Sequence, residues 1–162
     1  MDDRVAAIIV AGLGGGLDPS LRVGDVVIDD PSDLLGKRYT AFRFGKIETA
    51  GDIVATPEEK AELRGATGAL AVDMEASAVR CLGRRMNILV VNVRAISDAA
   101  TDRLDARLLS IIDDVGRIRV GKFISLILRH PLSFPQIIRT GRRAKVALRE
   151  LAKATVQIIE GL

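Results

Sequence analysis

The chain has 162 residues, 48% of them hydrophobic and 28% charged, which suits one globular domain with a sizeable core. A single Cys and a single His exclude an internal disulfide and a His-rich metal site, and no metal is expected. Four Phe, one Tyr and no Trp cannot build a stacking platform, so no specific nucleic-acid partner is expected. The chain shows neither a signal-peptide pattern nor an apolar run of about 18 residues, which predicts a cytoplasmic protein.

The net charge of +3 is unevenly distributed. Residues 117–162 carry ten basic and two acidic side chains, whereas the preceding residues carry 14 basic and 19 acidic ones. We therefore predict an α/β core over residues 1–116 and a basic helical extension over 117–162, packed on the same domain.

The first predicted elements are strands. The apolar run 5–11 is typical of a strand buried on both faces, and the glycine-rich segment 12–19 predicts a tight turn that needs positive φ. A second strand over 23–28, a loop over 30–45 and a third strand over 46–50 follow. The turn lacks the third glycine of the dinucleotide fingerprint, and no helix follows it to face a pyrophosphate.

A helix is predicted to begin at Thr56, with a capping box and a proline at its first position, and to end near Gly65. A strand over 69–73, a helix over 75–86 and a strand over 88–96 follow. This strand–helix–strand order indicates a βαβ unit and a largely parallel sheet.

Beyond Asp102 the pattern is helical, with helices expected over 103–115 and 120–129 and a long basic amphipathic stretch over 137–159, interrupted near Gly141. Three interpretations of the basic region remain open. It can be a helix packed on the sheet with a solvated basic face, a surface for anionic membranes, or a nucleic-acid contact that does not read bases.

Two other residues invite simple interpretations. Cys81 is predicted to be a buried, inert thiol on the packed side of its helix, and His130 a loop residue.

Acidic side chains follow two apolar strands. Asp73 ends the strand over 69–73 and Glu75 follows it, and Asp98 comes after the next strand. Ligands of open α/β sheets bind beyond the carboxyl ends of strands, so we expect the two segments to lie side by side at one cavity. The plainer alternative is that Asp73 or Asp98 caps a helix.

Four motifs occur in order: GLGGGLDPSLRVGDVV at 12–27, AGD at 50–52, VDMEA at 72–76 and RAISD at 94–98. Together they resemble the purine nucleoside phosphorylase and methylthioadenosine/adenosylhomocysteine nucleosidase family, over residues 5 to 102. The resemblance implies a three-layer α/β/α fold around a mixed, largely parallel sheet. It also implies cleavage of the N-glycosidic bond of a purine nucleoside by phosphorolysis or hydrolysis, with no cofactor and with phosphate as an optional co-substrate.

The resemblance further implies residue roles. Asp98 would be the general acid toward N7 of the purine, held by Ser97, and Glu75 would accept hydrogen bonds from the ribose hydroxyls. The other positions that it places at the substrate are Asp73, Met74, Val54, Ala55, Gly14 and Gly15.

The sequence departs from the family pattern at three places. The first strand–helix portion of the family has no counterpart before Met1, which would leave a sheet edge exposed and favours a homo-oligomer. Leu13 replaces a hydroxyl residue of the glycine turn, and Val54 replaces the aromatic residue that stacks on the base. A non-catalytic relative that binds nucleosides or serves in assembly, and a peripheral membrane module, are therefore the alternatives to an enzyme.

Within the family, the turn GGLDP at 15–19 and the basic C-terminal region most resemble the hopanoid-biosynthesis-associated phosphorylase branch. That resemblance implies a lipid-linked adenosine as the substrate and a peripheral membrane location.

Overall fold

The computed structural model describes residues 7–36, 39–104 and 134–161. These residues form a six-stranded sheet in the order β3-β2-β6-β1-β5-β4. The strands are β1 (Ala7–Gly16), β2 (Val26–Asp29), β3 (Arg43–Phe44), β4 (Ile47–Thr49), β5 (Ala71–Asp73) and β6 (Leu89–Asp98). The helices are α1 (Pro57–Thr67), α2 (Ala76–Met86) and α5 (Phe134–Glu160).

The two longest strands, β1 and β6, lie side by side in parallel at the centre of the sheet. β2 pairs antiparallel with β6, and β5 pairs antiparallel with β1. The outer pairs β2–β3 and β4–β5 are parallel. The sheet is therefore mixed, which confirms the predicted α/β fold class.

The prediction that β5 and β6 lie side by side in the sheet is wrong. β1 lies between them, and because β5 runs against β1 while β6 runs with it, β5 and β6 point in opposite directions. The carboxyl ends of β5 and β6 therefore do not meet at the same edge of the sheet, as those of neighbouring parallel strands would. The apolar runs over 69–73 and 88–96 are compatible with a parallel βαβ unit, but the pattern of residues within a strand does not determine which strands pair.

α1 begins with the predicted capping box. Thr56 accepts a hydrogen bond from the backbone of Glu59, whose side chain in turn accepts one from the backbone of Thr56. The helix runs past Gly65 to Thr67 and is capped by Gly68, which adopts a left-handed φ of 68° that a glycine tolerates without strain. The predicted end near Gly65 was about two residues too early because Gly65 lies exposed in the last turn, where it costs only local propensity.

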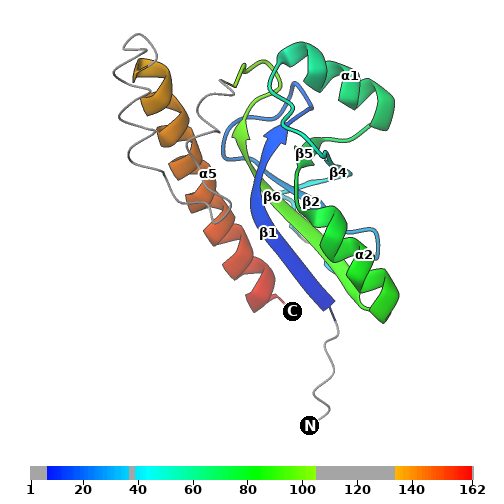
Figure 1. Ribbon diagram of the computed structural model, residues 1–162. Helices are drawn as coiled ribbons and strands as arrows, with labels where there is room; N and C mark the ends of the chain where they lie inside the picture. The colour runs from blue at the N-terminus through cyan, green and yellow to red at the C-terminus, as the bar shows by residue number, and fades with distance from the viewer. Residues whose placement is uncertain (1–6, 37–38, 105–133, 162) are drawn as a thin grey trace, which may run out of the picture.

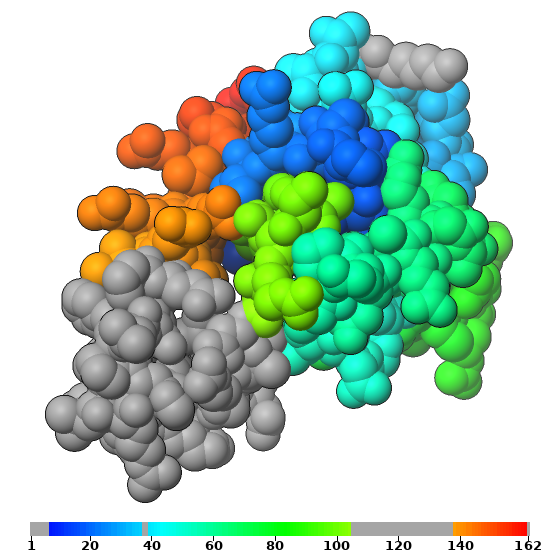
Figure 2. Space-filling model, turned by 90° about the horizontal axis from the view of Figure 1, so that it is seen from above, coloured from blue at the N-terminus to red at the C-terminus, as the bar shows by residue number. Residues whose placement is uncertain are grey.

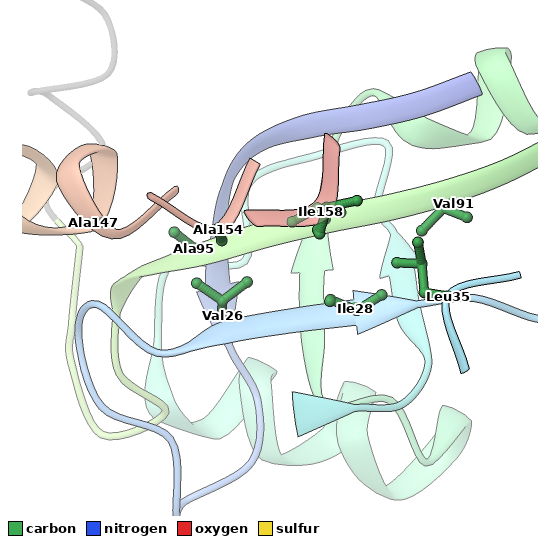
Figure 3. Close-up of a cluster of buried hydrophobic side chains, with 9 residues drawn as sticks. Val26, Ile28, Leu35, Val91, Ala95, Ala147, Ala154 and Ile158 are labelled. Carbon is green, nitrogen blue, oxygen red and sulfur yellow. The ribbon is translucent and has the colours of Figure 1, made fainter. Parts of the chain in front are cut away.

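α2 and α5 cover opposite faces of the sheet (Figure 1). α5 continues through Gly141 without the expected break and buries Ala147, Ala154 and Ile158 against the sheet. Figure 3 shows these side chains meeting Val26 and Val91 from the strands. Among the described helices, none combines the length and hydrophobicity needed to span a membrane. The predicted helix over 120–129, His130 and most of the helix over 103–115 lie outside the described residues.

Candidate active site

The end of β6 contains one irregularity that decides where its side chains point. Gly14 of β1 pairs with Ile96, but the next residue, Gly15, pairs with Asp98. Ser97 is therefore the extra residue of a β-bulge. A bulge breaks the regular alternation of faces along a strand, so Asp98 does not follow the pattern set by Arg94 and Ile96.

The contacts of consecutive glycines show the result. A Cβ on Gly14 would lie 3.2 Å from Cβ of Arg94, whereas a Cβ on Gly15 would lie 3.2 Å from Oδ2 of Asp98. Because consecutive strand residues project to opposite faces, Arg94 and Asp98 lie on opposite faces of β1. Val72 and Asp73 of β5 divide in the same way: Val72 lies next to Asp98, and Asp73 pairs with Arg94.

The glycines of β1 allow neighbouring side chains to lie close against the backbone, and they do not form a turn. β1 continues through Gly16, and none of Gly12, Gly14, Gly15 and Gly16 has a positive φ, so the predicted tight turn over 12–19 is wrong at its start. A Cβ on Gly12 would come 2.9 Å from Nη1 of Arg94. The buried arginine and aspartate side chains therefore pack directly on bare backbone.

The carboxylate of Asp98 is held at both oxygens. Ser97 Oγ donates to Oδ1 at 2.7 Å, and Lys60 Nζ donates to Oδ2 at 2.5 Å. The Asp98 side chain is 9% exposed and that of Lys60 is completely buried. Ser97 Oγ also lies 3.2 Å from the Gly14 carbonyl oxygen, which ties it to β1. The expectation that Ser97 contacts Asp98 thus agrees with the geometry.

The segment after Asp98 is fixed between two helices. Asp102 accepts a hydrogen bond from the Ala99 backbone at 2.8 Å and forms an ion pair with Arg143 of α5 at 2.7 Å. Lys60 of α1 donates to the carbonyl oxygens of Ala99 and Asp102. Figure 2 shows this yellow-green segment lying between α5, in orange, and α1, in green-cyan. Although burial raises the pKa of Asp102, the Arg143 guanidinium, the Ala99 amide and Lys60 together lower it below its usual value.

A second polar cluster lies on the other face of β1. Arg94 Nη2 and Asp73 Oδ2 form an ion pair at 2.7 Å, and Asn92 Nδ2 donates to the same oxygen at 3.0 Å. Arg94 Nη1 also donates to the Val10 carbonyl oxygen. Burial raises the pKa of Asp73, but the Thr49 hydroxyl, the Asn92 amide and the Arg94 guanidinium outweigh it and hold the pKa below its usual value.

The structure therefore separates two acidic residues that were expected at one cavity. Asp73 faces Arg94 and is almost completely buried, while Asp98 faces Lys60. Glu75 is the N-cap residue of α2, but its side chain makes no capping hydrogen bond, and it is exposed. No ion pair or hydrogen bond joins the Glu75 side chain to another part of the described chain.

The remaining predicted positions lie around these groups. Met74 is exposed at the start of α2, and Val54 packs on the small core cluster that contains Val72, on the Asp98 side of β1. The Ala55 amide donates to Glu59 Oε2 at 2.9 Å, and its carbonyl accepts from Leu104 at 2.8 Å. The amide is therefore engaged, whereas the carbonyl oxygen keeps a second lone pair.

A hollow of about 470 Å³ lies along α1, beside the segment that follows Asp98. Leu17, Arg64 and Thr101 are among its lining residues, which include none of the predicted site positions. Cys81 is exposed, so its assignment to the packed side of α2 is wrong. The helix buries only Ala76 and Gly83, so the apolar face that the 3.6-residue period predicted around Leu82 is not the packed one.

Two basic residues of the site were not anticipated. Lys60 sits among glutamates of α1 and looks like part of a solvated face, so only its position one turn after Thr56, beside Leu63, hinted at burial. Arg94 was visible as a charged residue inside an apolar strand, and such a residue needs a buried partner.

The described chain thus forms a mixed α/β sheet with helices on both faces and a buried, doubly held carboxylate at the end of a central strand. Residues 29–129 match the family model described as the phosphorylase superfamily. The chain belongs to this superfamily.

Solved structures of similar fold agree with this family. The 5′-methylthioadenosine/S-adenosylhomocysteine nucleosidase of Helicobacter pylori is similar with a TM-score of 0.63 and 17% identity, over 97% of this chain and 69% of that one. The corresponding nucleosidase of Streptococcus pneumoniae gives a TM-score of 0.51 and 22% identity, over 93% and 70%. Futalosine hydrolase of H. pylori gives 0.52 and 16%, over 92% and 68%. No curated protein matches the chain.

Proposed function

We propose that this chain cleaves the N-glycosidic bond of a purine nucleoside, with Asp98 as the acid toward the departing base. The observation that supports the proposal is the buried Asp98 carboxylate, oriented at both oxygens by Ser97 and Lys60, in a chain of the phosphorylase superfamily. The similarity of the fold to that of the H. pylori nucleosidase agrees with this reaction class.

The chemistry follows from the bond that breaks. When the C1′–N9 bond opens, its electron pair goes to the base and positive charge develops on the sugar. The Asp98 carboxyl gives its proton to N7 of the base, which stabilises the leaving group. Oxygen of water or phosphate then bonds to C1′, and the Asp98 carboxylate regains a proton from the nucleophilic water or from solvent.

Glu75 is proposed to bind the sugar. Its exposed carboxylate has no partner in the described chain, so both oxygens are free to accept hydrogen bonds from the ribose hydroxyls. Met74 beside it presents a half-exposed apolar side chain to the sugar. Val54, on the Asp98 side of β1, would contribute an apolar wall for the base.

A lipid-linked adenosine is the finer form of this proposal. The outward side of α5 carries exposed apolar side chains, among them Val146 and Leu148, between the basic residues Arg142, Lys145 and Arg149. Such a surface suits anionic lipid and would bring a membrane-held substrate to the protein. Flotation with phosphatidylglycerol vesicles at low salt should recover the protein with the vesicles, and recovery equal to that with neutral vesicles would count against the lipid-linked substrate.

The test of the reaction is release of free base. Adenosine, 5′-methylthioadenosine and an adenosine bearing an alkyl chain are incubated with the protein, with and without phosphate, and adenine is quantified by chromatography. Appearance of ribose 1-phosphate identifies phosphorolysis, and free ribose identifies hydrolysis. The substitution Asp98→Asn should lower turnover by at least ~100-fold, the scale of a lost acid.

Two results would overturn the proposal. If the protein releases no base from any of these nucleosides but binds them, it is a non-catalytic relative. If Asp98→Asn turns over as fast as the unchanged protein, Asp98 is not the acid.

A further inference from the structure

We infer that Lys60 is a positioning residue for Asp98, and that it sets how effectively Asp98 assists departure of the base. The inference rests on the proposed function. It starts from an ammonium group that is completely buried, in a helix whose glutamates are all exposed.

The bonds of Lys60 account for all three of its donors. Nζ donates to Asp98 Oδ2, to the Ala99 carbonyl at 2.8 Å and to the Asp102 carbonyl at 3.2 Å. An ammonium group has three N–H donors and no acceptor, so none is left for a substrate. Lys60 therefore acts through Asp98 and does not itself touch the reacting atoms.

The arrangement of these bonds fixes the direction of the carboxylate. Lys60 takes Oδ2 from the α1 side, Ser97 takes Oδ1 from its own strand, and Gly15 lies against the carboxylate without a side chain. Two of about four lone-pair positions of the carboxylate are thereby used, and about two remain for a proton or a further hydrogen bond. The group cannot rotate about its χ2 bond without breaking both contacts.

The charge of Lys60 adds to its geometry. When Asp98 gives a proton to the base it becomes a carboxylate, and an ammonium 2.5 Å away stabilises that product without any rearrangement. Burial strengthens this interaction, because little water is present to screen it. A purely structural lysine could tie α1 to the Ala99 and Asp102 carbonyls alone, but this one places its closest contact on the carboxylate.

The experiment separates help to the leaving group from general support of the fold. Adenosine needs protonation of its base, whereas 4-nitrophenyl β-D-ribofuranoside releases nitrophenolate, which leaves without a proton. Lys60→Gln retains amide donors for the carbonyls but removes the charge. It should lower kcat for adenosine by ~100-fold with KM changed by less than about threefold, since misplacement of a catalytic group costs on this scale. Turnover of the aryl riboside should stay within about threefold of the unchanged protein.

Two further variants complete the test. Arg80→Gln removes another partly buried ion pair, that of α2 with Asp29, and should leave both turnovers unchanged. Lys60→Arg retains the positive charge and should recover at least ~10-fold of the adenosine turnover lost in Lys60→Gln. If Lys60→Gln does not fold, as judged by circular dichroism, Lys60→Met, which also lacks the charge, replaces it with the same expected losses.

The outcomes distinguish the inference from the function on which it rests. If Lys60→Gln lowers the turnover of both substrates equally, or lowers neither, the role of Lys60 is overturned. A selective loss of adenosine turnover in Asp98→Asn would in that case still support the proposed function. An unchanged protein that releases base from none of the three nucleosides, or an Asp98→Asn variant with full turnover, overturns the proposed function and this inference with it.

Discussion

Gly14 of β1 passes so close to Val72 of β5 that a Cβ on Gly14 would lie 2.9 Å from the Val72 carbonyl oxygen. The same Cβ would also meet the stem of Arg94 at 3.2 Å. β1 and β5 pair only at Gly15 and Gly16, next to this contact. The place where β5 joins the sheet therefore depends on the absence of a side chain at Gly14.

The substitution Gly14→Ala should consequently destabilise the protein by ~1–3 kcal/mol, the usual cost of overpacking, because backbone and a buried arginine must both move. Urea unfolding followed by circular dichroism measures the change. The matched control is Gly65→Ala in α1, where a Cβ would meet nothing within 4 Å and should add up to ~1 kcal/mol of stability through helix propensity. Equal effects of the two substitutions would contradict the close-approach explanation.

The buried pair of Asp73 and Arg94 should make stability depend on pH in the acid range. The pKa of Asp73 in the folded chain lies below its ordinary value of 3.8, so the unfolded chain binds more protons as the pH falls. The stabilisation is thus complete above about pH 5 and is lost as the pH falls below 3.8 toward the folded pKa.

The variant Asp73→Asn tests this dependence. At pH 7 it should lose ~3–5 kcal/mol, since the arginine is left buried without its counter-charge. The difference from the unchanged protein should shrink as the pH falls from 5 to 3. A difference that stays constant over that range would show that the charge of Asp73 is not involved. Asp52→Asn, at an exposed site, serves as the control.

The packing of α5 on the sheet should contribute substantially to stability. Ile158 is completely buried against the strands, whereas Val156, two residues away, is 53% exposed. Ile158→Ala should therefore cost ~2–5 kcal/mol, and Val156→Ala should cost less than ~0.5 kcal/mol. Thermal unfolding of both variants checks this, and similar losses would mean that α5 does not pack as described.

The sequence predicted individual elements better than their arrangement. The capping box from Thr56 to Glu59 was correct because its chemistry is local to one helical turn. The order of the strands was not, since the insertion of β1 between β5 and β6 is a long-range choice that neither apolar run encodes. For the same reason Asp73 and Asp98 were assigned to one cavity.

The site was predicted in part for a similar reason. Asp98 and Ser97 are neighbours in the chain, so their contact could be expected from the motif. The partner of Asp98 on α1 lies 38 residues away and was not recognised, because a lysine among glutamates is usually solvated. The glycines were noticed, but their purpose was interpreted as backbone freedom when it is space for Arg94 and Asp98.

The single additional residue at Ser97 has a consequence for how this protein can vary in evolution. Regular pairing that kept Ser97 in the ladder would place Asp98 on the side of the sheet that holds Arg94, away from α1. Deletion of Ser97 would leave the acid directly after Ile96, still paired with Gly15 and on the α1 side, but without the hydroxyl that holds its Oδ1. We therefore expect natural relatives either to keep both the additional residue and its bulge or to lack both, because only these two arrangements leave the acid on the α1 side.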